Sequence, residues 1–252
     1  MKTKANSIHI LTALFMVLLN TAYAFPEGRL KQDDIYLVIY TTKKGHTGHV
    51  GFAVDNYKVV VRQVVKDNDT ITRYDSLRTH SLTYFDLWGP ADIQVGELDQ
   101  DLPARYYILP KSSSERRITA DYFLSKGLPH SYDYPCDALI RIRTTPSQDA
   151  RMKAIAEAMQ SEKNFFNGRS HNCTDYVLEC LNRLFNKNIT AREYIPFQWS
   201  STPNQLYKKI LETLEVEILK AAGEEVNNSF WKERVINTVI YNQFINHEKT
   251  KE

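Results

Sequence analysis

The sequence predicts an α+β fold in which an antiparallel sheet packs against helices. Two patterns predict this class. Short runs rich in Val, Ile and Tyr alternate with turn residues in the first third of the chain, which is typical of a β-meander. Longer segments with a helical repeat of apolar residues follow. The 11 Phe and 15 Tyr supply aromatic mass for a core, which excludes a largely disordered chain.

Turn residues divide the first part of the chain into short strands. Asp55-Asn56 indicates a tight reversal, and Asp67-Asn68-Asp69 indicates another turn. Residues 76–88 follow neither a strand nor a helix period, and we expect a loop with one helical turn there. The expected strands are 34–41, 49–54, 58–65, 70–74, 93–98 and 105–109.

Helices are expected in the second half of the chain. The clearest covers residues 172–185, where the apolar residues form one continuous stripe and Asn172 is placed to cap the first turn. Capping signals also begin helices at 112–126 and 146–160. After Pro196 we expect two more helices, about 202–222 and 224–247, separated by Gly223.

The N-terminus has the features of a signal peptide. Lys2 and Lys4 precede a mostly apolar run at 8–19, and Ala22 and Ala24 match the small-x-small pattern of a cleavage site. We therefore expect cleavage after Ala24, export to the periplasm or outside the cell, and no stable membrane span in the mature chain.

The charge balance argues against a nucleic-acid partner. The chain has 32 basic and 30 acidic residues, for a formal charge of +2. Cleavage would remove the two N-terminal lysines and no acidic residue, so the mature chain would be neutral. A neutral chain without a basic block lacks long-range attraction for phosphates.

Three cysteines remain after cleavage, an odd number for an oxidising compartment. Cys173 and Cys180 lie on the same expected helix, roughly 10 Å apart at 1.5 Å per residue. That separation exceeds the reach of a disulfide. The remaining possibilities are a bridge between Cys136 and one of the other two, or no bridge.

Cys173 is the candidate nucleophile because it begins the helix at 172–185. Unpaired amides and the positive end of the helix dipole favour the thiolate and can also receive an oxyanion. The alternative is that Cys173 is a small core residue that begins the apolar stripe. Cys180 lies in the middle of the same stripe, and we interpret it as a core residue.

His49 is the candidate general base. It follows a glycine at the start of an expected strand, and an imidazole facing a thiol at a helix start is the arrangement of thiol hydrolases. Gln63 on the next expected strand, flanked by Val61 and Val65, is the candidate for orienting the imidazole. The alternatives are a half-exposed strand histidine and a solvated edge glutamine.

A zinc site is an alternative role for the two histidines and the cysteine. His46 and His49 with Cys173 would give a partial zinc site, but no Cys-x-x-Cys pair or acidic partner accompanies them. We therefore expect neither a metal nor an organic cofactor.

These residues resemble the circularly permuted NlpC/P60 group of papain-like cysteine hydrolases. His49-Val50-Gly51-Phe52 matches the histidine motif of that group, and Asn172-Cys173-Thr174-Asp175-Tyr176-Val177 is similar to its cysteine motif and to that of lecithin–retinol acyltransferase relatives. The stretch 127–134 resembles the Gly-x-Pro-Tyr-Asp segment between them. The resemblance implies His49 as base and Cys173 as nucleophile, in the order expected for permuted members, and Gln63 departs from its commonly acidic third position.

We expect the chain to divide into a signal peptide (1–24), a papain-like catalytic domain (25–200) and a helical C-terminal extension (201–252), of which the resemblance accounts only for the middle part. Around the Cys–His pair we expect His46, Tyr132 and Asn172 to contact substrate.

Three functions remain open from the sequence. The first is an exported thiol hydrolase that cleaves an amide bond, most plausibly in a cell-wall peptide. The second uses the same pair on an ester or lipid acyl chain, with the aromatic stretch at 84–88 as an apolar wall. The third is a non-catalytic envelope binding module in which Cys173 is inert or tied to Cys136.

Overall fold

The computed structural model describes residues 33–43, 47–66, 69–90, 97, 99–112, 118–125, 128, 134–195 and 198–229. The chain divides into two units, Met1–Gln32 and Asp33–Glu252, and every described residue belongs to the second. The expected signal peptide lies outside the described residues.

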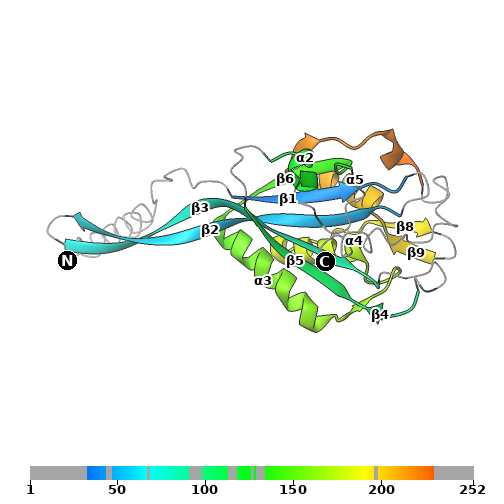
Figure 1. Cartoon of the computed structure of the whole chain (residues 1–252), viewed down its shortest axis with the longest axis horizontal. Helices are drawn as coiled ribbons and strands as arrows, with labels where there is room; N and C mark the ends of the chain where they lie inside the picture. Colours follow the sequence, from blue (N-terminus) through cyan, green and yellow to red (C-terminus); the bar gives the residue numbers. More distant parts are fainter. Residues whose placement is uncertain are drawn as a thin grey trace, which may run out of the picture. The chain divides into compact units, whose positions relative to one another are not determined.

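A six-stranded antiparallel sheet packs against helices, as Figure 1 shows. Its strand order is β10-β6-β1-β2-β3-β5. The predicted α+β class is therefore confirmed. The strands are β1 (Asp33–Tyr40), β2 (His49–Lys66), β3 (Asp69–Trp88), β4 (Leu102–Pro103), β5 (Arg105–Ser112), β6 (Ala138–Thr144), β7 (Phe165–Phe166), β8 (Arg192–Ile195), β9 (Gln198–Ser201) and β10 (Glu217–Lys220). The helices are α2 (Ala120–Ser125), α3 (Pro146–Glu162), α4 (Cys173–Phe185), α5 (Pro203–Thr213) and the 3₁₀ helix η2 (Glu224–Asn227).

Each face of the sheet carries its own apolar core. Alternate residues of a strand point to opposite faces, so Leu37 and Phe52 join the core formed with α3, α4 and α5, whereas Val38 and Ala53 join the core formed with α2. The α4 stripe contributes Val177 and Leu181, both fully buried. The predicted helix at 172–185 is confirmed, and it lies in the larger core.

The expected reversal at Asp55-Asn56 and the expected loop at 76–88 are both wrong. β2 and β3 run through these segments as two long paired strands. Their pairing shifts between Asp55 and Tyr57, so a β-bulge absorbs the turn-forming residues. Residues 49–54 and 58–65 therefore belong to one strand, and residues 70–74 belong to the same strand as 82–88.

The C-terminal prediction is correct only at its start. Thr202 caps α5 as its side chain accepts from the N–H of Gln205, but the helix ends at Thr213 instead of continuing to 222. Residues 217–220 pair with β6, and Glu217 forms an ion pair with Arg141 on that strand. Tertiary pairing thus overrides local helix propensity, and the segment expected to form a helical extension contributes a strand to the main sheet.

Other predicted elements differ in extent or fall outside the described residues. Within the range 112–126 expected to be helical, the described residues include α2, whereas Ser112 belongs to β5. The helix at 146–160 is confirmed as α3, with Thr145 as its cap. Of the strand expected at 93–98 only Glu97 is described, and the helix expected at 224–247 is described only to residue 229, with η2 at its start.

Beyond Asn56, β2 and β3 leave the sheet as a two-stranded ribbon (Figure 1). Val59, Val61, Val65 and Tyr74 are between 53% and 72% exposed there. The opposite face of the ribbon carries charged side chains, including an ion pair of Arg73 with Asp75. Val64 and Ile71 on that face are also exposed, by 42% and 50%, so both faces of the ribbon expose apolar side chains.

The Asn56 side chain fastens the ribbon to the sheet. Its Nδ2 donates to Ser81 Oγ at 3.0 Å, and its Oδ1 accepts from Thr83 Oγ1 at 3.0 Å and from Lys153 on α3. We expect Asn56→Ala to weaken this junction by about 1 kcal/mol because partly buried polar groups lose their hydrogen-bond partners. Hydrogen exchange should become faster in the ribbon but not in β1, and Gln63→Ala should leave both rates unchanged. Equal protection of the ribbon in Asn56→Ala would contradict this role.

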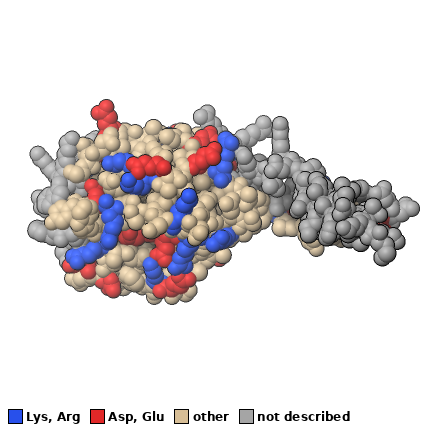
Figure 2. All heavy atoms as spheres, turned by 180° about the vertical axis from the view of Figure 1, so that it is seen from behind, with Lys and Arg blue, Asp and Glu red and all other residues tan. Residues whose placement is uncertain are grey.

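Positive and negative side chains are interspersed on the face shown in Figure 2. This distribution gives no single-sign stripe on that face. Among the described residues, no helix is long and apolar enough to span a membrane.

Candidate active site

Cys173 is the first residue of α4, and Asn172 caps this helix. The Asn172 Oδ1 accepts from the N–H groups of Thr174, at 2.8 Å, and Asp175, at 3.1 Å. The Asp175 carboxylate in turn accepts from the backbone N–H of Asn172, which completes a capping box. The expected cap is thus confirmed, and it fixes the position of the thiol.

This cap changes the expected supply of oxyanion donors. We expected several unpaired amides in the first turn. Two of these amides, of Thr174 and Asp175, donate to the Asn172 side chain. The backbone N–H of Tyr176 donates to the carbonyl oxygen of Asn172. Among the described residues, no acceptor is assigned to the N–H of Cys173. That N–H is therefore the first-turn donor that remains for an oxyanion.

The structure brings the predicted nucleophile and base together. The imidazole of His49, at the start of β2, lies beside the thiol of Cys173, close enough for the two groups to interact electrostatically. Its Nε2 lies 3.1 Å from Oδ2 of Asp86 on β3. The indole of Trp88 packs edge-on against the imidazole with ring centroids 5.0 Å apart. His49 and Asp86 are completely buried.

Opposite charges on both sides keep the imidazole protonated. Burial alone lowers the pKa of His49, but the negative charge of Cys173 and the Asp86 carboxylate outweigh it and raise this pKa to about 9. With this pKa the imidazole is a cation at neutral pH. A protonated imidazole beside a nucleophilic sulfur is able to serve as a general acid.

Asp86 occupies the position for which Gln63 was expected. Gln63 is exposed on the ribbon, opposite Thr72, because β2 leaves the sheet at the bulge near Asn56. Asp86 was missed because residues 76–88 were expected to form a loop. Read as a strand, its last five residues, 84–88, would have shown Asp86 as the one charged residue among large apolar side chains, a pattern typical of functional sites.

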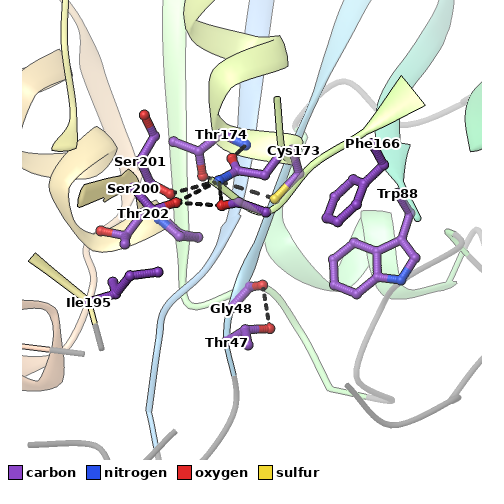
Figure 3. Close-up of a pocket in the computed structure, with 13 residues that line it drawn as sticks. Thr47, Gly48, Trp88, Phe166, Cys173, Thr174, Ile195, Ser200, Ser201 and Thr202 are labelled. Atoms are coloured by element: carbon purple, nitrogen blue, oxygen red, sulfur yellow. Dashed lines mark hydrogen bonds between the residues drawn. The ribbon is translucent and has the colours of Figure 1, made fainter. Parts of the chain in front are cut away.

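Cys173 opens into a pocket between α4, the start of β2 and the β8–β9 hairpin (Figure 3). The sulfur faces an aromatic wall made by Trp88 and Phe166, and Ile195 closes another side (Figure 3). The cavity has a volume of about 70 Å³ and opens to solvent, so it is smaller than a typical small-molecule site. His49 is fully buried behind the sulfur, so the thiol is the member of the pair that reaches the pocket.

Gly48 shapes the base of the pocket. Its φ of +77° lies in the left-handed region, which favours glycine. A Cβ there would lie 2.7 Å from the Tyr40 carbonyl oxygen and 2.9 Å from the Thr42 nitrogen. Only glycine therefore allows the chain to turn here and place His49 at the first position of β2.

The three residues expected to contact substrate have different outcomes. His46 and Tyr132 lie outside the described residues. Asn172 lines the pocket, but its side chain has a structural role, since its Nδ2 also donates to the carbonyl oxygens of Gly168 and Ser201.

A second histidine, His171, lies just before the cap and is structural. Its Nε2 is 3.0 Å from the hydroxyl of Tyr106, which itself donates to the carbonyl oxygen of Lys163 at 2.6 Å. Burial and the charge of Lys163 lower the pKa of His171 to about 4. The neutral ring therefore fixes the loop that leads into α4.

All three cysteines are free. Cys136 lies in the core on the α2 side of the sheet, whereas Cys173 and Cys180 lie in the core on the other side. The open question about a bridge is thus answered by the fold, and Cys173 is not tied to Cys136.

In the described part of the chain, no group of three or more His, Cys, Asp or Glu side chains is arranged to hold a metal ion. The residues of the site are instead those of acid–base and nucleophilic chemistry.

Comparison with known proteins adds no relative. The chain matches no protein-family model, no curated protein and no solved structure.

Proposed function

We propose that this protein is an exported cysteine hydrolase that cleaves an amide bond, with a cell-wall peptide as the preferred substrate. One observation carries the proposal: the Cys173 thiol, at the start of α4 and open to a pocket, lies beside an imidazole that is hydrogen-bonded to Asp86. Nucleophile, base and orienting carboxylate are the three parts that thiol hydrolysis requires.

The mechanism follows from these positions. The thiolate of Cys173 attacks the carbonyl carbon, and the resulting oxyanion accepts from the N–H of Cys173. Protonated His49 gives its proton to the leaving amine, the C–N bond breaks, and a thioester remains on the sulfur. Neutral His49 then takes a proton from water, which attacks the thioester and releases the acid and the thiolate.

The resemblance to permuted NlpC/P60 hydrolases supports the same assignment. In this chain the strand that begins with His49 precedes the helix that begins with Cys173, as in that group. Under this proposal the sheet with α4 against it corresponds to a permuted papain-like core, and Asp86 takes the commonly acidic third position.

A second candidate is an ester or lipid acyl chain as substrate. The observation that favours it is the apolar wall of Trp88, Phe166 and Ile195 beside the sulfur, which would accommodate an acyl group. Release of a short acyl ester without cleavage of cell-wall peptides would favour this candidate, and the reverse result would favour the amide.

Selective labelling of Cys173 tests the proposed function without a known substrate. We expect iodoacetamide to modify Cys173 in the folded protein at neutral pH. Cys136 and Cys180 should react only after unfolding, because both are completely buried and burial raises the pKa of each thiol, that of Cys136 to about 12. His49→Ala should slow modification of Cys173 by about tenfold or more. Peptide mass mapping at several pH values measures this, and equal reactivity of the three thiols would contradict the proposal.

A further inference from the structure

Tyr84 lies next to the Asp86 carboxylate. Tyr84 and Asp86 are two residues apart on β3, so their side chains point to the same face of the sheet. The Tyr84 side chain is buried, with 1% exposure. Its hydroxyl lies near enough to Asp86 for the charge of the carboxylate to act on it. In the described part of the chain, no aligned hydrogen-bond partner is found for this buried hydroxyl.

Gly51 provides the space that the tyrosine occupies. A Cβ at this position would lie 2.2 Å from the Tyr84 hydroxyl oxygen and 2.6 Å from the ring carbon that bears it. It would also lie 2.9 Å from the carbonyl oxygen of Phe85, which is backbone and cannot move aside alone. Only glycine at position 51 is therefore compatible with this placement of Tyr84.

The hydroxyl of Tyr84 keeps its proton. Burial, followed by the charge of the Asp86 carboxylate, raises the pKa of Tyr84 well above its ordinary value. A protonated phenol donates its hydrogen, and a buried carboxylate is stabilised by donors. The chemistry of the two groups is thus complementary.

We infer that Tyr84 is a positioning residue that holds the Asp86 carboxylate toward His49, and that Gly51 is glycine because it admits this tyrosine. The inference deepens the proposed function and rests on it. It places the buried groups in a chain from the Tyr84 hydroxyl through Asp86 and His49 to the sulfur of Cys173. The glycine of the His49-Val50-Gly51 segment then serves the site rather than the sheet alone.

The inference makes a prediction about the ion pair. Tyr84→Phe removes one donor from a fully buried carboxylate, so the anionic form of Asp86 is less favoured. A weaker negative charge beside His49 lets the imidazole lose its proton at lower pH. Tyr84 thus acts on the thiol through Asp86 and His49.

The test measures the rate at which iodoacetamide modifies Cys173 as a function of pH. In the unaltered protein a step in this rate is expected near pH 9, where His49 loses its proton. Tyr84→Phe should move the step to lower pH by about one unit or more, the shift expected for the loss of one hydrogen bond to a charged group. Gly51→Ala, which displaces the same ring but keeps the hydroxyl, should move the step in the same direction.

Two comparisons separate positioning from packing. Tyr84→Phe should have no further effect when Asp86 is already asparagine, because the two changes act through one carboxylate. Tyr36→Phe is the matched control, since Tyr36 is also a buried strand tyrosine whose hydroxyl donates to a carboxylate two residues away, at 3.2 Å on Asp34. It should leave the step unchanged.

The outcomes distinguish this inference from the proposed function. If Cys173 is selectively reactive with a step near pH 9, but Tyr84→Phe and Gly51→Ala lower only thermal stability and leave the step in place, the positioning role is overturned and the hydrolase stands. If Cys173 in the unaltered protein reacts no faster than Cys180, the proposed function itself fails.

Discussion

Cys173→Ala is expected to abolish hydrolysis, with a fall of about 10⁴-fold or more, because no other side chain in the pocket replaces the sulfur as nucleophile. His49→Ala should cause a loss of similar size, and the double variant should be no worse than either single variant, since the two groups act as one unit. Release of new amino termini from cell-wall peptides, followed by mass spectrometry, measures the effect.

Cys180→Ala is the matched control for this prediction. It lies on the same helix, is fully buried and has its sulfur 3.6 Å from that of Met159. Its loss should lower stability by about 1 kcal/mol through a small cavity but leave the turnover rate unchanged. Activity that survives in Cys173→Ala, or that disappears in Cys180→Ala while the protein remains folded, would exclude Cys173 as the nucleophile.

Asp86→Asn should have the second largest effect, a loss of about 10²- to 10⁴-fold in turnover, because the amide keeps the shape of the side chain but removes the charge that orients and stabilises the imidazolium. It should also change the pH dependence. The carboxylate contributes to the raised pKa of His49, so its neutralisation lowers that pKa. The alkaline limb of the rate profile, expected near pH 9 in the unaltered protein, should therefore move to lower pH.

Gln63→Ala serves as the control, because Gln63 was the residue expected from the sequence to hold the imidazole. It is exposed on the ribbon, so its removal should leave both the rate and the alkaline limb unchanged. A profile of Asp86→Asn that coincides with that of the unaltered protein would show that Asp86 does not act on His49.

The parts of the site that depend on local patterns were predictable from the sequence. The apolar stripe and the capping residue Asn172 predict the start of α4, so the local sequence is enough to place Cys173 at a helix N-terminus. The glycine before His49 similarly indicated a strand start, and Gly48 does adopt a positive φ there. Both signals need only a few neighbouring residues.

The parts that depend on long-range pairing were not predictable. Asp86 reaches His49 only because β2 and β3 align across the sheet, and turn-type residues within these strands are accommodated by a bulge. β10 likewise forms because β6 offers a free edge and Arg141 a partner for Glu217, whereas its local sequence continues a helical pattern. Register and edge availability are properties of the assembled sheet, which a single sequence does not show.

The acid–base pair and the nucleophile reach the site by different routes. His49 and Asp86 lie on two strands that are consecutive in the sequence and pair with each other, whereas Cys173 lies on a helix much later in the chain. Contacts of such high sequence separation form late in folding. Under the proposed function, a partly folded chain would thus hold its imidazole and carboxylate together without the sulfur, and the site would be completed only when α4 docks.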